Sequence, residues 1–228
     1  MNFLKRSAVI LCVFAASGAG VCRAGDDFQY WSRAQVKVID TPYVDYVNYW
    51  EMRFDHDASN TGFWQGSQAL AFDFFKYLGL GLNYTYLETE ADNARKTANE
   101  FKYQHRLELE ANPRWSWRER INFKNRNRME FRWVEGKGSD NGRLRHLAEA
   151  EVPVHLKRFP FLHSFFVNDE IFIDFKRRTI SENRVIPAGV TVKLWKQSKL
   201  KVFYMIQSQQ GATWSSNQVL GSHILIDF

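Results

Sequence analysis

Small or polar residues alternate with large apolar residues along the segment Leu78-Gly79-Leu80-Gly81-Leu82-Asn83-Tyr84-Thr85-Tyr86. A period of two is the spacing of a β-strand, in which successive side chains point to opposite faces. With its continuation this segment predicts a strand over 78–90, and no helical period competes with this pattern over any long window. Ten further segments predict strands in the same way, at 28–38, 44–54, 64–74, 101–110, 121–134, 143–154, 163–175, 184–194, 199–209 and 219–228.

The chain ends in another alternating stretch, Ser222-His223-Ile224-Leu225-Ile226-Asp227-Phe228, whose last residue is aromatic. This ending resembles the last strand of bacterial outer-membrane barrels, and the resemblance implies that Phe228 is a signal for the barrel-assembly machinery. Strands of such barrels contact lipid with every second residue, which gives segments of about 10 alternating residues. We therefore expect residues 25–228 to form an all-β, antiparallel, up-and-down transmembrane barrel of about 10–12 strands.

The number of strands does not fit this expectation fully, because bacterial single-chain barrels have even numbers of strands. Either 28–38 is not a full strand of the barrel wall, or a break that divides one of the other predicted strands has been missed.

Residues 1–24 have the pattern of a secretory signal peptide. Lys5 and Arg6 precede an apolar run over 8–16, and cleavage is expected after Ala24. The run is shorter than the roughly 20 apolar residues of a membrane helix. Attachment of lipid at Cys22 is the alternative. We expect export to the outer membrane of a Gram-negative bacterium, where lipid surrounds the barrel.

The composition excludes several kinds of site. Both cysteines, Cys12 and Cys22, lie in the leader, so no thiolate or disulfide is available in the mature chain. Three of the 31 basic residues also lie there, which leaves 28 basic against 25 acidic residues. A nucleic-acid partner therefore has no support from the charge. The sequence has no phosphate-binding glycine loop and no metal-ligand spacing, so we expect no cofactor and no metal.

Charged residues share one face of the strand predicted over 121–134 and of its two neighbours. A basic residue facing lipid near the midplane costs about 2–4 kcal/mol, so we expect this face to line the lumen. A register that places Glu130 opposite Arg145 on one side and Arg106 on the other would pair opposite charges. The alternative is that Arg and Glu simply alternate on a wet wall. The predicted lumen residues are Arg106, Glu108, Glu110, Lys124, Arg126, Arg128, Glu130, Arg132, Arg145, Glu149 and Glu151.

Glu170 and Asp174 share a face and form a possible acidic pair in the lumen. They could serve acid–base chemistry or bind calcium, but Arg143 and Arg145 on the adjoining strand could also neutralise them.

Connections and aromatic residues also follow the barrel pattern. Tight links at 75–77 and 196–198 alternate with longer polar connections at 55–63, 89–100, 135–142, 177–183 and 210–217. Short turns at one end and longer loops at the other are typical of outer-membrane barrels. Trp115 and Trp117 lie just before a turn, where we expect an aromatic girdle at the membrane interface.

Three polar residues fall on the face expected to contact lipid, namely Asn125, Asn127 and His105. A β-bulge could re-aim them.

No catalytic arrangement is evident. Adjacent residues of a strand point to opposite faces, so Ser222 and His223 cannot act on each other. The remaining histidines are dispersed. Enzymatic activity stays uncertain, and the sequence favours its absence.

Three blocks of this sequence resemble a bacterial outer-membrane family catalogued as domain of unknown function 2490 (DUF2490). They are Asp27-Phe28-Gln29-Tyr30-Trp31, Asn125-Arg126-Asn127-Arg128-Met129-Glu130-Phe131-Arg132 and Phe166-Val167-Asn168-Asp169-Glu170-Ile171-Phe172. The resemblance implies an outer-membrane barrel and no particular activity.

The sequence thus favours a porin-like narrow channel or a structural barrel with a charged lumen. The alternatives are a lipid-modifying outer-membrane enzyme and a soluble, lipocalin-like periplasmic barrel that binds an apolar ligand with an apolar inner face. The oligomeric state stays open.

Overall fold

The computed structural model of this chain describes residues 27–92, 99–118, 120–138, 142–195, 197–211 and 213–227. The predicted signal peptide and Phe228 lie outside these residues. In the described ranges no helix is long and apolar enough to cross a membrane. The strands are β1 (Phe28–Asp40), β2 (Val44–Asp55), β3 (Asn60–Phe75), β4 (Leu78–Asp92), β5 (Asn99–Trp117), β6 (Ile121–Val134), β7 (Arg143–Pro153), β8 (Leu162–Asp174), β9 (Thr179–Trp195), β10 (Ser198–Gln210) and β11 (Trp214–Asp227). Each corresponds to one predicted strand.

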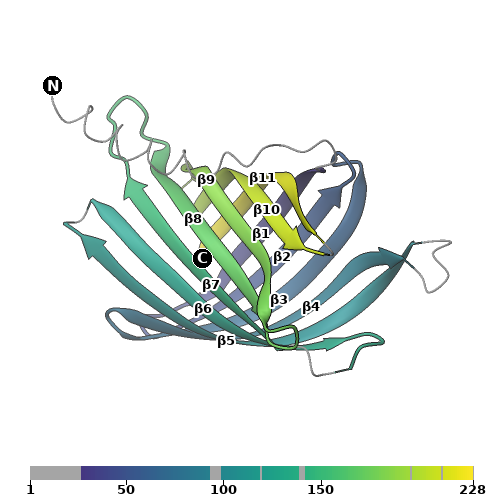
Figure 1. The fold of residues 1–228 in the computed structure, drawn as a ribbon. Helices are drawn as coiled ribbons and strands as arrows, with labels where there is room; N and C mark the ends of the chain where they lie inside the picture. The colour runs from purple at the N-terminus through teal and green to yellow at the C-terminus, as the bar shows by residue number, and fades with distance from the viewer. Residues whose placement is uncertain are drawn as a thin grey trace.

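The eleven strands close into a single barrel in which β1 pairs with both β2 and β11 (Figure 1). Consecutive strands are antiparallel, but β1 and β11 are parallel, with Phe28 beside Gln218 and Lys37 beside Asp227. An odd number of up-and-down strands makes the first and last strands run in the same direction. The expectation of an even number was therefore wrong, since β1 is a full wall strand and no break was missed.

The two ends of the barrel differ in their connections. At one end, here called the turn end, the strands are joined by 41–43, 76–77, 118–120, 154–161 and 196–197. At the other, the loop end, they are joined by 56–59, 93–98, 135–142, 175–178 and 211–213. Four of the five predicted long connections are shorter than expected, because the strands extend into them. The predicted asymmetry remains, with 154–161 as the exception at the turn end.

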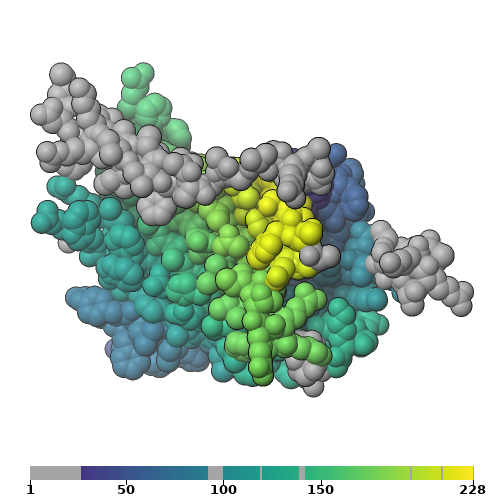
Figure 2. All heavy atoms as spheres, in the orientation of Figure 1, coloured from purple at the N-terminus to yellow at the C-terminus, as the bar shows by residue number. Residues whose placement is uncertain are grey.

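The outer face of the barrel carries most of its exposed large apolar side chains. Exposed large side chains include Trp50 of β2, Leu82 of β4 and Phe165 of β8. The space-filling view shows outer side chains covering the strands drawn in green on this side (Figure 2). A lipocalin-like barrel would carry its apolar face inside, so these exposed outer side chains do not favour that alternative.

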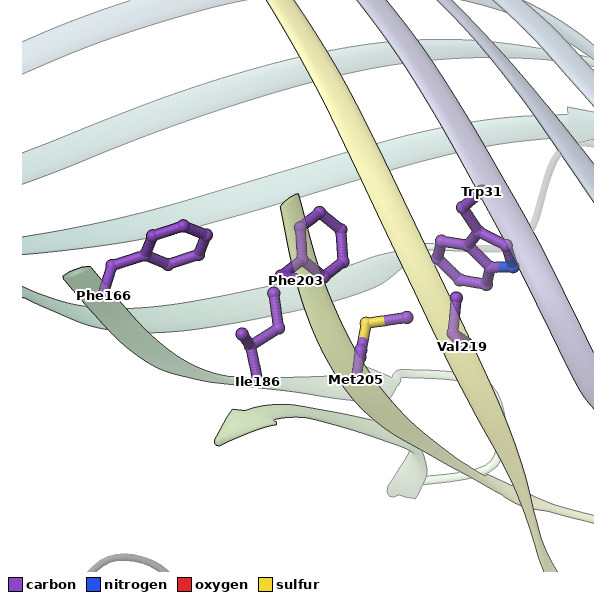
Figure 3. Packing of buried hydrophobic residues seen from close by; sticks show 6 residues of the cluster. All are labelled: Trp31, Phe166, Ile186, Phe203, Met205 and Val219. Atoms are coloured by element: carbon purple, nitrogen blue, oxygen red, sulfur yellow. The ribbon is translucent and has the colours of Figure 1, made fainter. Parts of the chain in front are cut away.

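A second apolar group lies inside the barrel, against β1 and β8 to β11. Its side chains gather on one side of the interior (Figure 3). The sequence analysis did not predict this inner cluster, which comprises Trp31, Phe166, Ile186, Phe203, Met205 and Val219.

Two rings of the inner cluster pack directly onto glycines of neighbouring strands. A Cβ added to Gly189 would fall 2.3 Å from Cζ of Phe166, and one added to Gly221 would fall 2.1 Å from Cζ of Phe203. The absence of a side chain at both positions is what allows the rings to lie flat against the wall.

We expect Gly221→Ala to lower the free energy of unfolding by about 1–3 kcal/mol, because the added methyl group would displace the Phe203 ring. Gly66→Ala in β3 is the matched control, since a Cβ there meets no atom within 4 Å. Urea unfolding of the refolded barrel measures the difference. Equal unfolding midpoints for the two variants would contradict this packing.

Candidate functional site: the ion-paired interior

The structure places the eleven predicted lumen residues on the inner faces of β5, β6 and β7, but in a different register. Glu130 lies opposite Arg143 on β7 and Glu108 on β5. The expected partners Arg145 and Arg106 are each displaced by two residues, so the predicted register was wrong on both sides. A displacement of two residues keeps every side chain on its predicted face.

Glu130 lies at the centre of the charged interior and is 0% exposed. Arg143 donates from Nε to Oε2 of Glu130 at 2.7 Å, and Arg145 donates from Nη1 to Oε1 at 3.0 Å. Both carboxylate oxygens are therefore held by guanidinium groups of β7. A buried carboxylate needs such partners, because an unpaired charge in the interior is strongly destabilising.

Glu170 on β8 is a second buried carboxylate with two arginine partners. Arg145 donates from Nη2 to its Oε2 at 2.9 Å, and Arg126 donates from Nη2 to its Oε1 at 2.7 Å. Asp174 bonds to Arg132 at 3.2 Å. Arginines thus neutralise both acids, but of the two predicted partners only Arg145 does so, since Arg143 bonds to Glu130.

Some direct neighbours in the ladder carry the same charge, whereas others, such as Glu130 and Arg143, carry opposite charges and bond to each other. Glu108 lies directly opposite Glu130, and Arg128 lies opposite Arg145. Arg128 contacts Glu110, which lies directly opposite it on β5, at 2.6 Å, and Glu108, which lies on the diagonal, at 2.9 Å. The long arginine side chain therefore reaches direct and diagonal partners, which offsets the like-charge pairs of this register.

Nearer the loop end, arginines and aromatic rings stack on one another across the interior. The guanidinium of Arg53 lies 3.7 Å from the ring centroid of Trp31 and 4.0 Å from that of Phe63. Arg184 lies 4.8 Å from Trp31 and 4.5 Å from Phe172. We call these five residues the guanidinium–aromatic stack. Since Trp31 is on β1 and Arg184 on β9, the stack bridges two intervening strands.

Arginine fits this stack because its planar guanidinium group can lie over an aromatic ring while its N–H groups donate hydrogen bonds within the guanidinium plane. Arg53 donates to Glu51 at 2.7 Å, and Arg184 donates to Glu182 at 2.6 Å. Each cation is thus paired with a carboxylate two residues away on its own strand. The stack was not predicted, although an Arg and a Glu spaced by two on one strand face is a signal for such a pair.

Other contacts also join strands that are not neighbours in the sheet. Nζ of Lys201 on β10 lies 3.8 Å from Oε1 of Glu149 on β7, and Arg126 of β6 reaches Glu170 of β8. Side chains of strands two and three positions apart in the sheet therefore meet inside the barrel.

A cavity of about 330 Å³ remains on the turn-end side of these contacts. It is lined by Asn112, Pro113, Arg114, Lys124, Asn125, Arg126, Leu147 and Glu149. Its charged lining could accept water or small ions.

The predicted girdle residues lie on the outer face at the turn end of β5. Trp115 is 46% exposed and Trp117 is 53% exposed, and the Trp115 ring stacks on Phe123 of β6 at 5.1 Å. Both are therefore outer residues and do not belong to the inner core.

The structure gives no support for a Ser–His pair in the last strand. Ser222 points outward, where its hydroxyl group lies 2.6 Å from that of Tyr30. His223 points inward and packs against the Phe203 ring. Among the described residues, no group of three His, Cys, Asp or Glu side chains could hold a metal ion.

Comparison with known proteins shows the family of this chain and indicates no activity. The family model described as Protein of unknown function (DUF2490) matches residues 28–218. No curated protein and no solved structure matches the chain. The matched range begins with β1 and extends into β11, and so this chain belongs to the DUF2490 family.

Proposed function

We propose that this chain is an outer-membrane β-barrel whose interior is a structural core, and that it acts through its ends and outer wall and not as an open pore. The observation that carries the proposal is the burial of inward side chains on all eleven strands. They include Trp31, Glu51, Phe63, Leu87, Glu108, Glu130, Arg145, Phe172, Glu182, Gln207 and Val219.

Several features support the membrane location. The strands of 11 to 19 residues are at least as long as the roughly 9–11 residues that cross a bilayer. Exposed tryptophans lie towards both ends, with Trp117 and Trp195 at the turn end and Trp133 and Trp214 at the loop end. Aromatic girdles at both interfaces are typical of outer-membrane barrels. Membrane fractionation of the native host, with heat-modifiable gel migration, tests the location. Recovery in the soluble periplasmic fraction would overturn it.

A narrow channel is the second candidate, and the turn-end cavity favours it. For conduction, ions would need a path from this cavity past Glu130 and the guanidinium–aromatic stack. Such a path requires those side chains to move, so the channel would be closed at rest.

The proposed location also implies an orientation of the barrel in the membrane. Short turns of outer-membrane barrels face the periplasm, which assigns the turn end to that side. Because β1 starts at the loop end, Asp27, which bonds to His56 and Asp57 there, would then lie on the cell-surface side.

We expect an epitope tag inserted between residues 26 and 27 to bind antibody on intact cells. A tag between 157 and 158, in the long connection at the turn end, should bind only after the outer membrane is permeabilised. The reverse pattern would show that the barrel has the opposite orientation.

A further inference from the structure

A group of polar side chains interrupts the apolar outer face on β6 to β9. We call it the outer polar patch, and it comprises Asn125, Asn127, His146, Asp169 and Asn183. The first two were expected on this face. The pairing of β6 with β7 has no register shift, so no bulge re-aims Asn127.

The patch is bonded together internally. Oδ1 of Asn127 lies 2.7 Å from Nδ1 of His146, and its Nδ2 donates to the carbonyl of Ala111 at 3.3 Å. Nδ2 of Asn183 donates to Oδ1 of Asp169 at 2.6 Å. These bonds hold the side chains in place along the wall and fix their direction.

Part of the hydrogen-bonding capacity of the outer polar patch is unused at the surface. Asp169 is exposed, and the described residues offer its second carboxylate oxygen no partner. Along β8 the outward neighbours of Asp169 are Val167 and Ile171, so the carboxylate lies within the apolar band. Polar groups without partners are costly in hydrocarbon, so lipid alone is a poor occupant for this patch.

Catalysis does not explain the patch. Although the Asn127–His146 pair could orient an imidazole base, none of the neighbouring outward positions supplies a hydroxyl or thiol nucleophile. These positions are Asn125, Met129, Leu144, Ala148, Asp169, Ile171 and Ile173. The patch also lies at mid-strand, away from the interfacial level of lipid ester groups.

We propose that a second copy of this chain covers the outer polar patch in the membrane. The inference rests on the proposed membrane location. The patch holds an acceptor, the Asp169 carboxylate, beside donors, the amides and the His146 ring, so it is complementary to itself. A two-fold axis parallel to the barrel axis places two such patches face to face, which is the usual geometry of a homodimer.

Short side chains at the centre of the patch favour close approach of two walls. Ala148 lies directly opposite Asn125 and Asp169, Ala150 follows it on the outer face of β7, and Ala111 lies opposite Asn127. Small residues allow backbones to come close in membrane interfaces. By contrast, the outer face of β4 carries Leu80, Leu82 and Tyr84.

Thiol cross-linking in native membranes tests the proposal. Cys12 and Cys22 are replaced by alanine, so that each variant has one cysteine, either Ala148→Cys or the control Leu82→Cys. A short bis-maleimide should give a covalent dimer with Ala148→Cys and little with Leu82→Cys. Adding Asp169→Leu should lower the cross-linked fraction several-fold.

Membrane insertion is scored separately by resistance to carbonate extraction. Inserted Ala148→Cys chains that cross-link no more than Leu82→Cys would overturn the dimer and leave the proposed function intact. Asp169→Leu chains that cross-link as well as their parent would also overturn it, because the patch would then not form the contact. Extraction of the unaltered chain from the membrane by carbonate would contradict the proposed function itself.

Discussion

Glu130→Gln is expected to lower the free energy of unfolding by about 3–5 kcal/mol, the usual cost of removing one partner from a buried ion pair. The substitution preserves shape and removes only the charge. Arg143 and Arg145 would then remain in the interior without the carboxylate that lies 2.7 Å and 3.0 Å from them.

Urea unfolding of the refolded barrel measures this change. Glu100→Gln is the matched control, because Glu100 lies on β5 and is exposed. Its substitution is expected to alter the free energy of unfolding by no more than about 0.5 kcal/mol. If the two variants unfolded at the same urea concentration, Glu130 would not hold the interior together.

Phe172→Ala is expected to cost about 3–5 kcal/mol, the range for removing a buried phenylalanine ring. Phe172 is 0% exposed, and the guanidinium groups of Arg143, Arg145 and Arg184 lie within 4.8 Å of its ring centroid. The truncation removes the surface on which all three cations pack. It also opens space at the level of Glu130.

Phe165→Ala provides the control from the same strand. Phe165 lies on the outer face of β8 and is 48% exposed, so its truncation leaves no internal cavity. We expect Phe172→Ala to unfold at a clearly lower urea concentration than Phe165→Ala. The opposite order would mean that the outer wall, and not the interior, contributes the dominant packing.

The faces of the strands could be predicted from the sequence, but their register could not. A period of two assigns Glu130 to the inner face, and a shift by two residues does not change that assignment. The arginine side chain reaches a diagonal partner as well as a direct one. Charge matching therefore identified Arg145 as a partner of Glu130 and still gave the wrong register.

The filled interior was harder to predict because β8 and β10 carry large side chains on both faces. Phe165 and Phe166 are consecutive, as are Phe203 and Tyr204. Alternation cannot identify an inner apolar cluster where both faces are apolar. The parallel closure of β1 on β11 was missed because it depends on the number of strands, which is a global property that no single segment reveals.

The filled interior is tested most directly by single-channel conductance of the chain refolded into a planar lipid bilayer, with folding checked by heat-modifiable gel migration. The unaltered chain is expected to give no discrete current steps. A variant with Trp31→Ala and Phe172→Ala that still shows the folded band is expected to give them, because it lacks two rings of the guanidinium–aromatic stack. Steady, discrete steps from the unaltered chain would contradict the closed interior and establish a channel.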